Sequence, residues 1–207
     1  TPAFSLSEGN GIIQYQRLFW AYTGPATTAT LLPALGITLE VLAARTGTLL
    51  FARRALIVAG IVLGQFGLTA WGQHLLVTTD TEALALIGSL FSLLAAAPAL
   101  VILLSWLVML SRVQDWRSVP ILLTGLQTLF VVLSGVAGIL LAVPSIGLVL
   151  HGSYVTTGHL HLVALGLVLL SFLTGLFHWW PSIMNRRISP LAGPSVPITV
   201  VVGIIAT

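Results

Sequence analysis

The residues best suited to chemistry in this sequence are histidines, because the chain has no cysteine and all eight of its basic residues are arginines. His159 and His161 are separated by one residue, which on an α-helix turns their side chains about 200° apart. The two rings therefore cannot bind one metal ion, for which an i, i+4 spacing is typical. Such a pair on a buried helix suits a helix that lies between two cofactors. Haem is the natural candidate, because a neutral imidazole is a common axial ligand of haem iron.

A simpler interpretation is that His159 and His161 hydrogen-bond to neighbouring helices or line a water path. Two other ionisable residues have interpretations that involve no cofactor. His178 precedes two tryptophans, and such a cluster is typical of the aromatic belt at a membrane interface. Glu40 is a candidate for a proton path, but extension of its side chain to the membrane surface is the favoured interpretation.

The composition predicts that these histidines belong to a membrane protein. Of the 207 residues, 57% are apolar and only 6% are charged, and the mean hydropathy is +1.07. A soluble domain carries roughly a quarter charged residues. These values exclude a soluble domain, a disordered chain and a nucleic-acid-binding surface. The absence of cysteine excludes disulfides, iron–sulfur clusters and thiolate metal sites.

Continuous apolar runs predict an all-α, polytopic membrane bundle, because helices satisfy every backbone polar group inside lipid. A β-barrel would require alternation of apolar and polar residues instead. We expect five full transmembrane helices and a partial sixth, which is too short to cross a bilayer. A polar N-terminal segment, residues 1–17, would precede the bundle of residues 18–207. The predicted spans are residues 18–43, 54–77, 83–111, 119–143, 149–180 and the partial 194–207.

The charges between these spans predict how the bundle is oriented. Seven of the eight arginines fall in the first, third and fifth gaps, whereas the second gap holds only Asp80 and Glu82. By the positive-inside rule, the arginine-rich gaps are cytoplasmic. His74, His159 and His161 then share the outer half of the membrane, with the latter two placed two to three turns inside the fifth span. Ionisable residues at such depths are functional candidates by default.

Around these histidines the sequence resembles subunit I of the haem–copper oxidase superfamily, which includes the terminal oxidases and the nitric-oxide reductases. The stretch His151-Gly-Ser-Tyr-Val-Thr-Thr-Gly-His159-Leu-His161 is similar to the tenth helix of that subunit. Three further segments are similar to its sixth, seventh and eighth helices: residues 25–33, 72–74 and 88–92. The resemblance covers about residues 17–190, as helices six to ten and the start of helix eleven.

The resemblance implies a role for each histidine of this motif. His159 would bind the high-spin haem of the active site, and His161 the low-spin haem that supplies its electrons. His151 would lie near the haem propionates and, as in some members, near a structural metal. One or two haems are therefore expected, which agrees with the two-cofactor interpretation of the spacing.

The sequence departs from the family at the second active-site metal, which is copper or non-haem iron held by three histidines. Gly24 and Gln73 stand where two of them would be, and His74 is the remnant of the site. A glutamine amide is a weak neutral donor for such a metal. Thr28 replaces the tyrosine or glutamate of the sixth helix, and residues 95–97 lack the glutamate of the nitric-oxide reductases. We therefore expect copper and non-haem iron to be absent.

The first five helices of the family supply the other ligand of the low-spin haem, so the function needs another chain or a first half missing from this sequence. We expect a haem-binding subunit of a respiratory complex in an energy-transducing bacterial or archaeal membrane. Its expected partners are other membrane subunits, the lipid bilayer and a cytochrome c or quinol donor, but no nucleic acid. Oxidoreductase activity of the oxidase or nitric-oxide reductase type stays open. The alternatives are a structural homologue without redox chemistry and a transporter segment.

Overall fold

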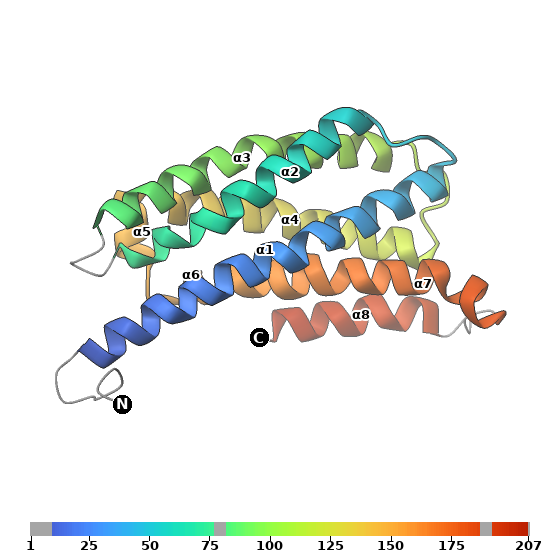
Figure 1. Ribbon diagram of the computed structural model, residues 1–207. Coiled ribbons are helices and arrows are strands. Elements are labelled where there is room, and N and C mark those ends of the chain that lie inside the picture. The colour runs from blue at the N-terminus through green and yellow to red at the C-terminus, as the bar shows by residue number, and fades with distance from the viewer. Residues whose placement is uncertain (1–9, 77–81, 187–191, 207) are drawn as a thin grey trace.

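The computed structural model describes residues 10–76, 82–186 and 192–206. This part of the chain is an elongated bundle of helices that run roughly side by side, without a strand among them (Figure 1). Five of its helical segments are long and apolar enough to cross a membrane. The predicted all-α membrane bundle is thus confirmed. The five segments are α1 (Asn10–Thr46), α2 (Arg53–Ala70) with η3 (Trp71–Leu75), α3 (Glu82–Leu110), α4 (Val119–Ala142), and α6 (Tyr154–His161) continued by η4 (Leu162–Leu169) and α7 (Leu170–Met184).

Two shorter helices complete the described bundle. The seven-residue α5 (Pro144–Leu150) follows α4 after a break at Val143. The last helix, α8 (Ala192–Ile205), has 14 residues and packs against α4 and η4. Its length corresponds to the predicted partial sixth span, because a full crossing needs about 20 residues.

The first and last of the five long segments differ from their predicted bounds. Helix α1 begins at Asn10, inside the predicted polar segment 1–17. The fifth segment begins at Tyr154 and not at residue 149, because Gly152 adopts a φ of +81° and the Ser153 side chain caps the new helix by accepting from the Val155 N–H. As a result, His159 lies about one and a half turns inside this segment, and not two to three.

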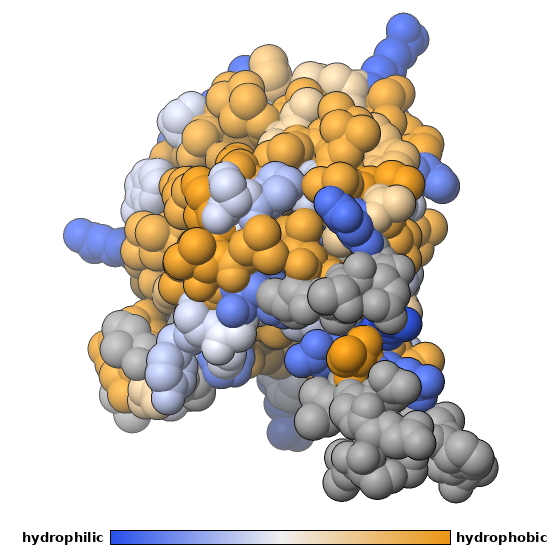
Figure 2. All heavy atoms as spheres, turned by 90° about the vertical axis from the view of Figure 1, so that its left-hand side faces the viewer, coloured by the Kyte–Doolittle hydropathy of each residue, from blue (hydrophilic) through white to orange (hydrophobic). Residues whose placement is uncertain are grey.

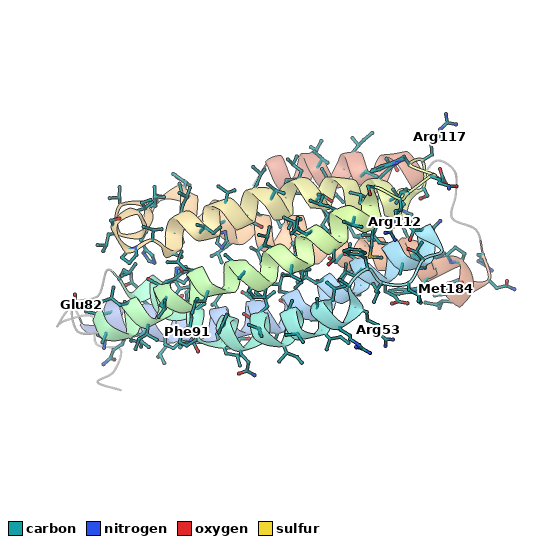
Figure 3. All side chains as sticks on the ribbon, turned by 90° about the horizontal axis from the view of Figure 1, so that it is seen from above. Arg53, Glu82, Phe91, Arg112, Arg117 and Met184 are labelled. Atoms are coloured by element: carbon teal, nitrogen blue, oxygen red, sulfur yellow. The ribbon has the colours of Figure 1, made fainter. Side chains whose placement is uncertain are left out.

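The arginines of the first and third gaps between the long helices lie at one end of the bundle. Figure 3 shows Arg53, Arg112 and Arg117 at this end and Glu82 at the other. The end without these arginines faces the viewer in Figure 2 and is mostly hydrophobic, with scattered hydrophilic residues. Gaps rich in arginine and gaps without arginine alternate along the sequence, and the two kinds of gap lie at opposite ends of the molecule. We refer to them below as the arginine end and the far end.

A dense apolar core fills the half of the bundle near the arginine end. Leu42, Trp106, Met109 and Ile121 are among its fully buried side chains, and they join α1, α3 and α4. Small residues replace such large side chains along several helices toward the far end, where α1–α4 surround a cavity. The half near the arginine end is thus closely packed, and the space that could hold a ligand lies in the half toward the far end.

A buried polar cluster of Thr38, Gln127 and Ser171 ties α1, α4 and α7 together. The Thr38 hydroxyl donates to Gln127 Oε1 at 3.2 Å and lies 3.0 Å from the Ser171 hydroxyl. Gln127 Nε2 donates to the Leu167 carbonyl at 2.9 Å and also to Ser171 Oγ. All three side chains are fully buried. Such hydrogen bonds hold helices together in a membrane, where lipid offers polar groups no partner.

Candidate functional site: a histidine-lined cavity

The candidate site is a cavity of about 540 Å³ in the half of the bundle toward the far end. Side chains of α1, α2, η3, α3, α4, α6 and η4 form its wall, and most of them are apolar or small. Gln73, His74 and His159 are among the polar residues that line it. A volume of this size lies within the range of pockets that hold small ligands and cofactors, and a few polar groups in an apolar wall are typical of them.

His159 reaches this cavity from α6. Its ring packs against Gly138 of α4, where an added Cβ would lie only 3.1 Å from His159 Cε1. The ring also faces the backbone of Ser134, one turn earlier on α4. Its Nδ1 is buried without a conventional hydrogen-bond partner among the described residues. The imidazole is thus held in place by packing while it borders a cofactor-sized space, which suits a ligand of haem iron.

His161 is half-buried and does not line the cavity that His159 borders. The rings of His159 and His161 therefore lie on different sides of the helix, as their spacing predicts. The π-helical segment η4 begins directly after His161. Such segments are rare in proteins and occur frequently at functional sites.

Trp20, His74 and His151 form a cluster of three rings at the far end of the cavity. The ring centroids of Trp20 and His74 are 3.7 Å apart with planes inclined by 12°, and those of His74 and His151 are 5.6 Å apart. His74 belongs to η3 and is buried. His151 lies in the turn between α5 and α6, where partial burial lowers its pKa below the ordinary value. No sequence motif pointed to Trp20, which joins the cluster through the packing of α1 against η3.

A second tryptophan occupies the space beside Gly24. A Cβ added to Gly24 would lie 2.4 Å from the Cβ of Trp71 and 3.4 Å from its Cα. Because these are atoms close to the Trp71 backbone, they cannot swing aside as the tip of a long side chain can. Position 24 therefore has no room for a side chain that reaches the cavity. Gly24 was recognisable from the sequence as a missing ligand, whereas the role of Trp71 had no signal except its place one residue before Gly72.

The described residues contain no group of three histidine or acidic side chains arranged to hold a metal ion. Gln73 Nε2 lies 3.4 Å from His74 Nε2, and both residues are buried. Of the predicted site residues, the structure thus brings His74 and His159 to one cavity and His151 to its far end. His161 lies apart from them.

His178 and Glu40 lie near the arginine end, away from the cavity. His178 Nδ1 accepts a hydrogen bond from Arg45 Nε at 3.1 Å. Glu40 is exposed on α1 and lies close enough to influence His178 electrostatically. Neither residue lines the cavity, which agrees with the interpretation of both as residues of the membrane surface.

Comparison with known proteins shows the family of this chain. The family model described as cytochrome c and quinol oxidase polypeptide I matches residues 3–207. The chain belongs to this family. The resemblance predicted from the histidine motif is therefore confirmed, and membership agrees with the five membrane-spanning segments of the bundle.

The relatives within the oxidase polypeptide I family are distant and much longer. The chain is 26% identical over 195 residues to cytochrome c oxidase subunit 1 of Thermostichus vulcanus, which is 93% of this chain and 35% of the relative. It is 26% identical over 190 residues to the heme-copper oxidase subunit I+III of Aeropyrum pernix, which is 92% of this chain and 23% of the relative. It is 26% identical over 187 residues to cytochrome c oxidase polypeptide 1 of Halobacterium salinarum, which is 90% of this chain and 31% of the relative. The chain thus spans about a quarter to a third of the length of these relatives.

Proposed function

We propose that the chain is a haem-binding part of a respiratory electron-transfer complex and that His159 binds one haem within the cavity. The observation that carries this proposal is the position of the His159 ring, fixed against Gly138 at the wall of an apolar space of about 540 Å³. Membership of the oxidase polypeptide I family supports the choice of haem as the ligand.

The residues around the cavity suit this cofactor in two respects. A neutral imidazole is the usual nitrogen ligand of haem iron, and the half-buried His159 ring borders the cavity with its Nδ1 atom buried. The largely apolar wall would exclude water from a flat hydrophobic ring system. A haem bound here would supply a centre that gains and loses one electron. His151, at the far end of the cavity, is proposed to lie near the haem propionates.

His161 is proposed to bind a second haem on the other side of its helix. Its half-buried ring does not line the cavity, so the remainder of that haem site would come from elsewhere in the complex. We therefore propose other membrane subunits as partners and a cytochrome c or quinol as the electron donor of the complex. The names of its relatives, which describe them as oxidase subunits, support this assignment.

We infer that the chain has no copper or non-haem iron site. Trp71 fills the space beside Gly24, where the resemblance would require one ligand. Gln73 replaces a second ligand, and the face of His74 is covered by Trp20. With one imidazole left of three, the proposed role is electron transfer within the complex and not the reduction of oxygen or nitric oxide at this site.

A pyridine haemochrome spectrum of the purified complex tests the proposed haem binding. Metal analysis of the same sample tests the inferred absence of copper and non-haem iron. We expect haem iron at one or two equivalents per chain and no stoichiometric copper or non-haem iron assigned to this subunit. A complex without haem would reject the proposal in favour of a purely structural homologue. Stoichiometric metal that disappears in a His74→Ala variant would reject the inference that the second metal site is absent.

A further inference from the structure

The helix that carries His159 and His161 changes its form directly after these two residues. Helix α6 ends at His161, and the next eight residues form the π-helical segment η4. A π-helix joins backbone groups five residues apart, so it turns less per residue than an α-helix. Conversion of η4 to an α-helix would rotate α6 relative to α7 by roughly the 100° of one residue. The form of η4 therefore decides where the two histidine rings point.

His159, Val163 and Leu167 form a row along this helix, and all three line the cavity. On a continuous α-helix, side chains four residues apart drift by about 40°, so the two ends of this row would diverge by about 80°. Val163 and Leu167 belong to η4, whose smaller turn per residue offsets the drift between them. The π-helical form thus keeps the whole row directed at one cavity.

One face of α4 contacts this helix at two levels. Gly138 packs against the ring of His159, as described above. About three turns earlier on the same face of α4, Gln127 Nε2 donates a hydrogen bond to the Leu167 carbonyl at 2.9 Å. The Gly138 contact holds the ring of His159, and the Gln127 bond holds the backbone of η4. A loss of the second contact would therefore change how the first one fits.

The bond from Gln127 reaches η4 where the pattern of backbone hydrogen bonds changes. The Leu167 carbonyl also accepts from the Leu170 N–H, which is three residues further on and not the four of an α-helix. Inside a membrane no water takes the place of a missing donor, so a side-chain donor stabilises the backbone at such a change. The Thr38 hydroxyl donates to Gln127 Oε1, which fixes the amide with its nitrogen toward Leu167.

We propose that Gln127 is a positioning residue for the haem ligands of this chain. Its bond to the Leu167 carbonyl holds η4 in the π-helical form, which directs the His159 ring into the cavity and the His161 ring to the other side of the helix. Gln127 does not line the cavity itself, so it acts on a haem through the helix that carries the ligands. This inference rests on the proposed function, in which His159 binds haem.

The vibration of the bond between iron and His159 tests this role, because its frequency depends on the direction of the imidazole. Resonance Raman spectroscopy of the reduced, purified complex measures it. We expect the band to shift in Gln127→Met, which has a side chain of similar length without a donor. Thr38→Val is the matched control, because it removes a hydrogen bond of the same buried cluster and leaves the Leu167 carbonyl its donor. It should lower the unfolding temperature without moving the band.

Gln127→Leu serves as a second variant without a donor, and haem content is recorded for every sample. We expect both Gln127 variants to retain haem and to shift the band. An unchanged band in both, an equal shift in Thr38→Val, or loss of haem from both Gln127 variants would overturn the positioning role. Absence of haem from the unchanged protein would instead reject the proposed function, so the two failures are distinguishable.

Discussion

The indole of Trp20 lies flat against the imidazole of His74, with ring centroids 3.7 Å apart and planes inclined by 12°. Both side chains are 8% exposed. We expect Trp20→Ala to destabilise the protein by about 3–5 kcal/mol, because it removes a large buried ring and the stacked pair. Thermal unfolding of the detergent-purified protein measures this effect. Tyr22→Ala, at a position 76% exposed on the same helix, should have little effect, and equal losses in the two variants would contradict the prediction.

Gly24 should tolerate no larger side chain while Trp71 is present. A Cβ at position 24 would lie 2.4 Å from Trp71 Cβ, so we expect Gly24→Ala to cost about 1–3 kcal/mol through overpacking. Gly36→Ala is the control on the same helix, where a Cβ meets nothing within 4 Å. It should be neutral or slightly stabilising, because alanine favours a helix more than glycine does.

A double-mutant cycle separates the contact between these two positions from other effects. Trp71→Ala should reduce the additional cost of Gly24→Ala, because the clashing side chain is then shorter. If the two free energies of unfolding were simply additive, Trp71 would not be what excludes a side chain at position 24.

Gln127 should stabilise the bundle through its links to Thr38, Ser171 and the Leu167 carbonyl. We expect Gln127→Leu to reduce the free energy of unfolding by about 1–2 kcal/mol, because the deletion leaves buried hydroxyl and carbonyl groups without this partner. Thr128→Val provides the control, since the Thr128 hydroxyl bonds only within its own helix, to the Thr124 carbonyl. A Gln127→Leu protein that unfolds at the same denaturant concentration as this control would disprove the role of the cluster.

The two histidines of the His-x-His motif should have separable spectroscopic effects. We expect His161→Ala to abolish a sharp reduced α-band, because it removes the proposed ligand of the low-spin haem. The His159→Ala variant should lose the haem of the cavity and retain that band. Reduced-minus-oxidised spectra of the purified complex measure both. His178→Ala should preserve both signals, because His178 pairs with Arg45 away from the cavity. An unchanged spectrum in His161→Ala would refute the assignment of this residue.

Much of the architecture could be predicted because it depends on local properties of the chain. The apolar runs indicated the membrane helices, and the arginine-rich gaps indicated which helix ends lie together. The prediction failed at residue 149, where Gly152 and Ser153 restart the helix at Tyr154. The turn residues were visible in the sequence, but the apolar run around them concealed the break.

The sequence by itself determined the opposite directions of His159 and His161, because the geometry of one helix fixes the angle between side chains two residues apart. It also determined that position 24 carries no ligand side chain. Only the tertiary structure decided that Trp71 fills the space beside Gly24, that Trp20 stacks on His74, and that Gln127 joins two other helices. These contacts link residues of different helices, often far apart in the chain. They depend on the rotation and depth of each helix in the packed bundle, which no local pattern specifies.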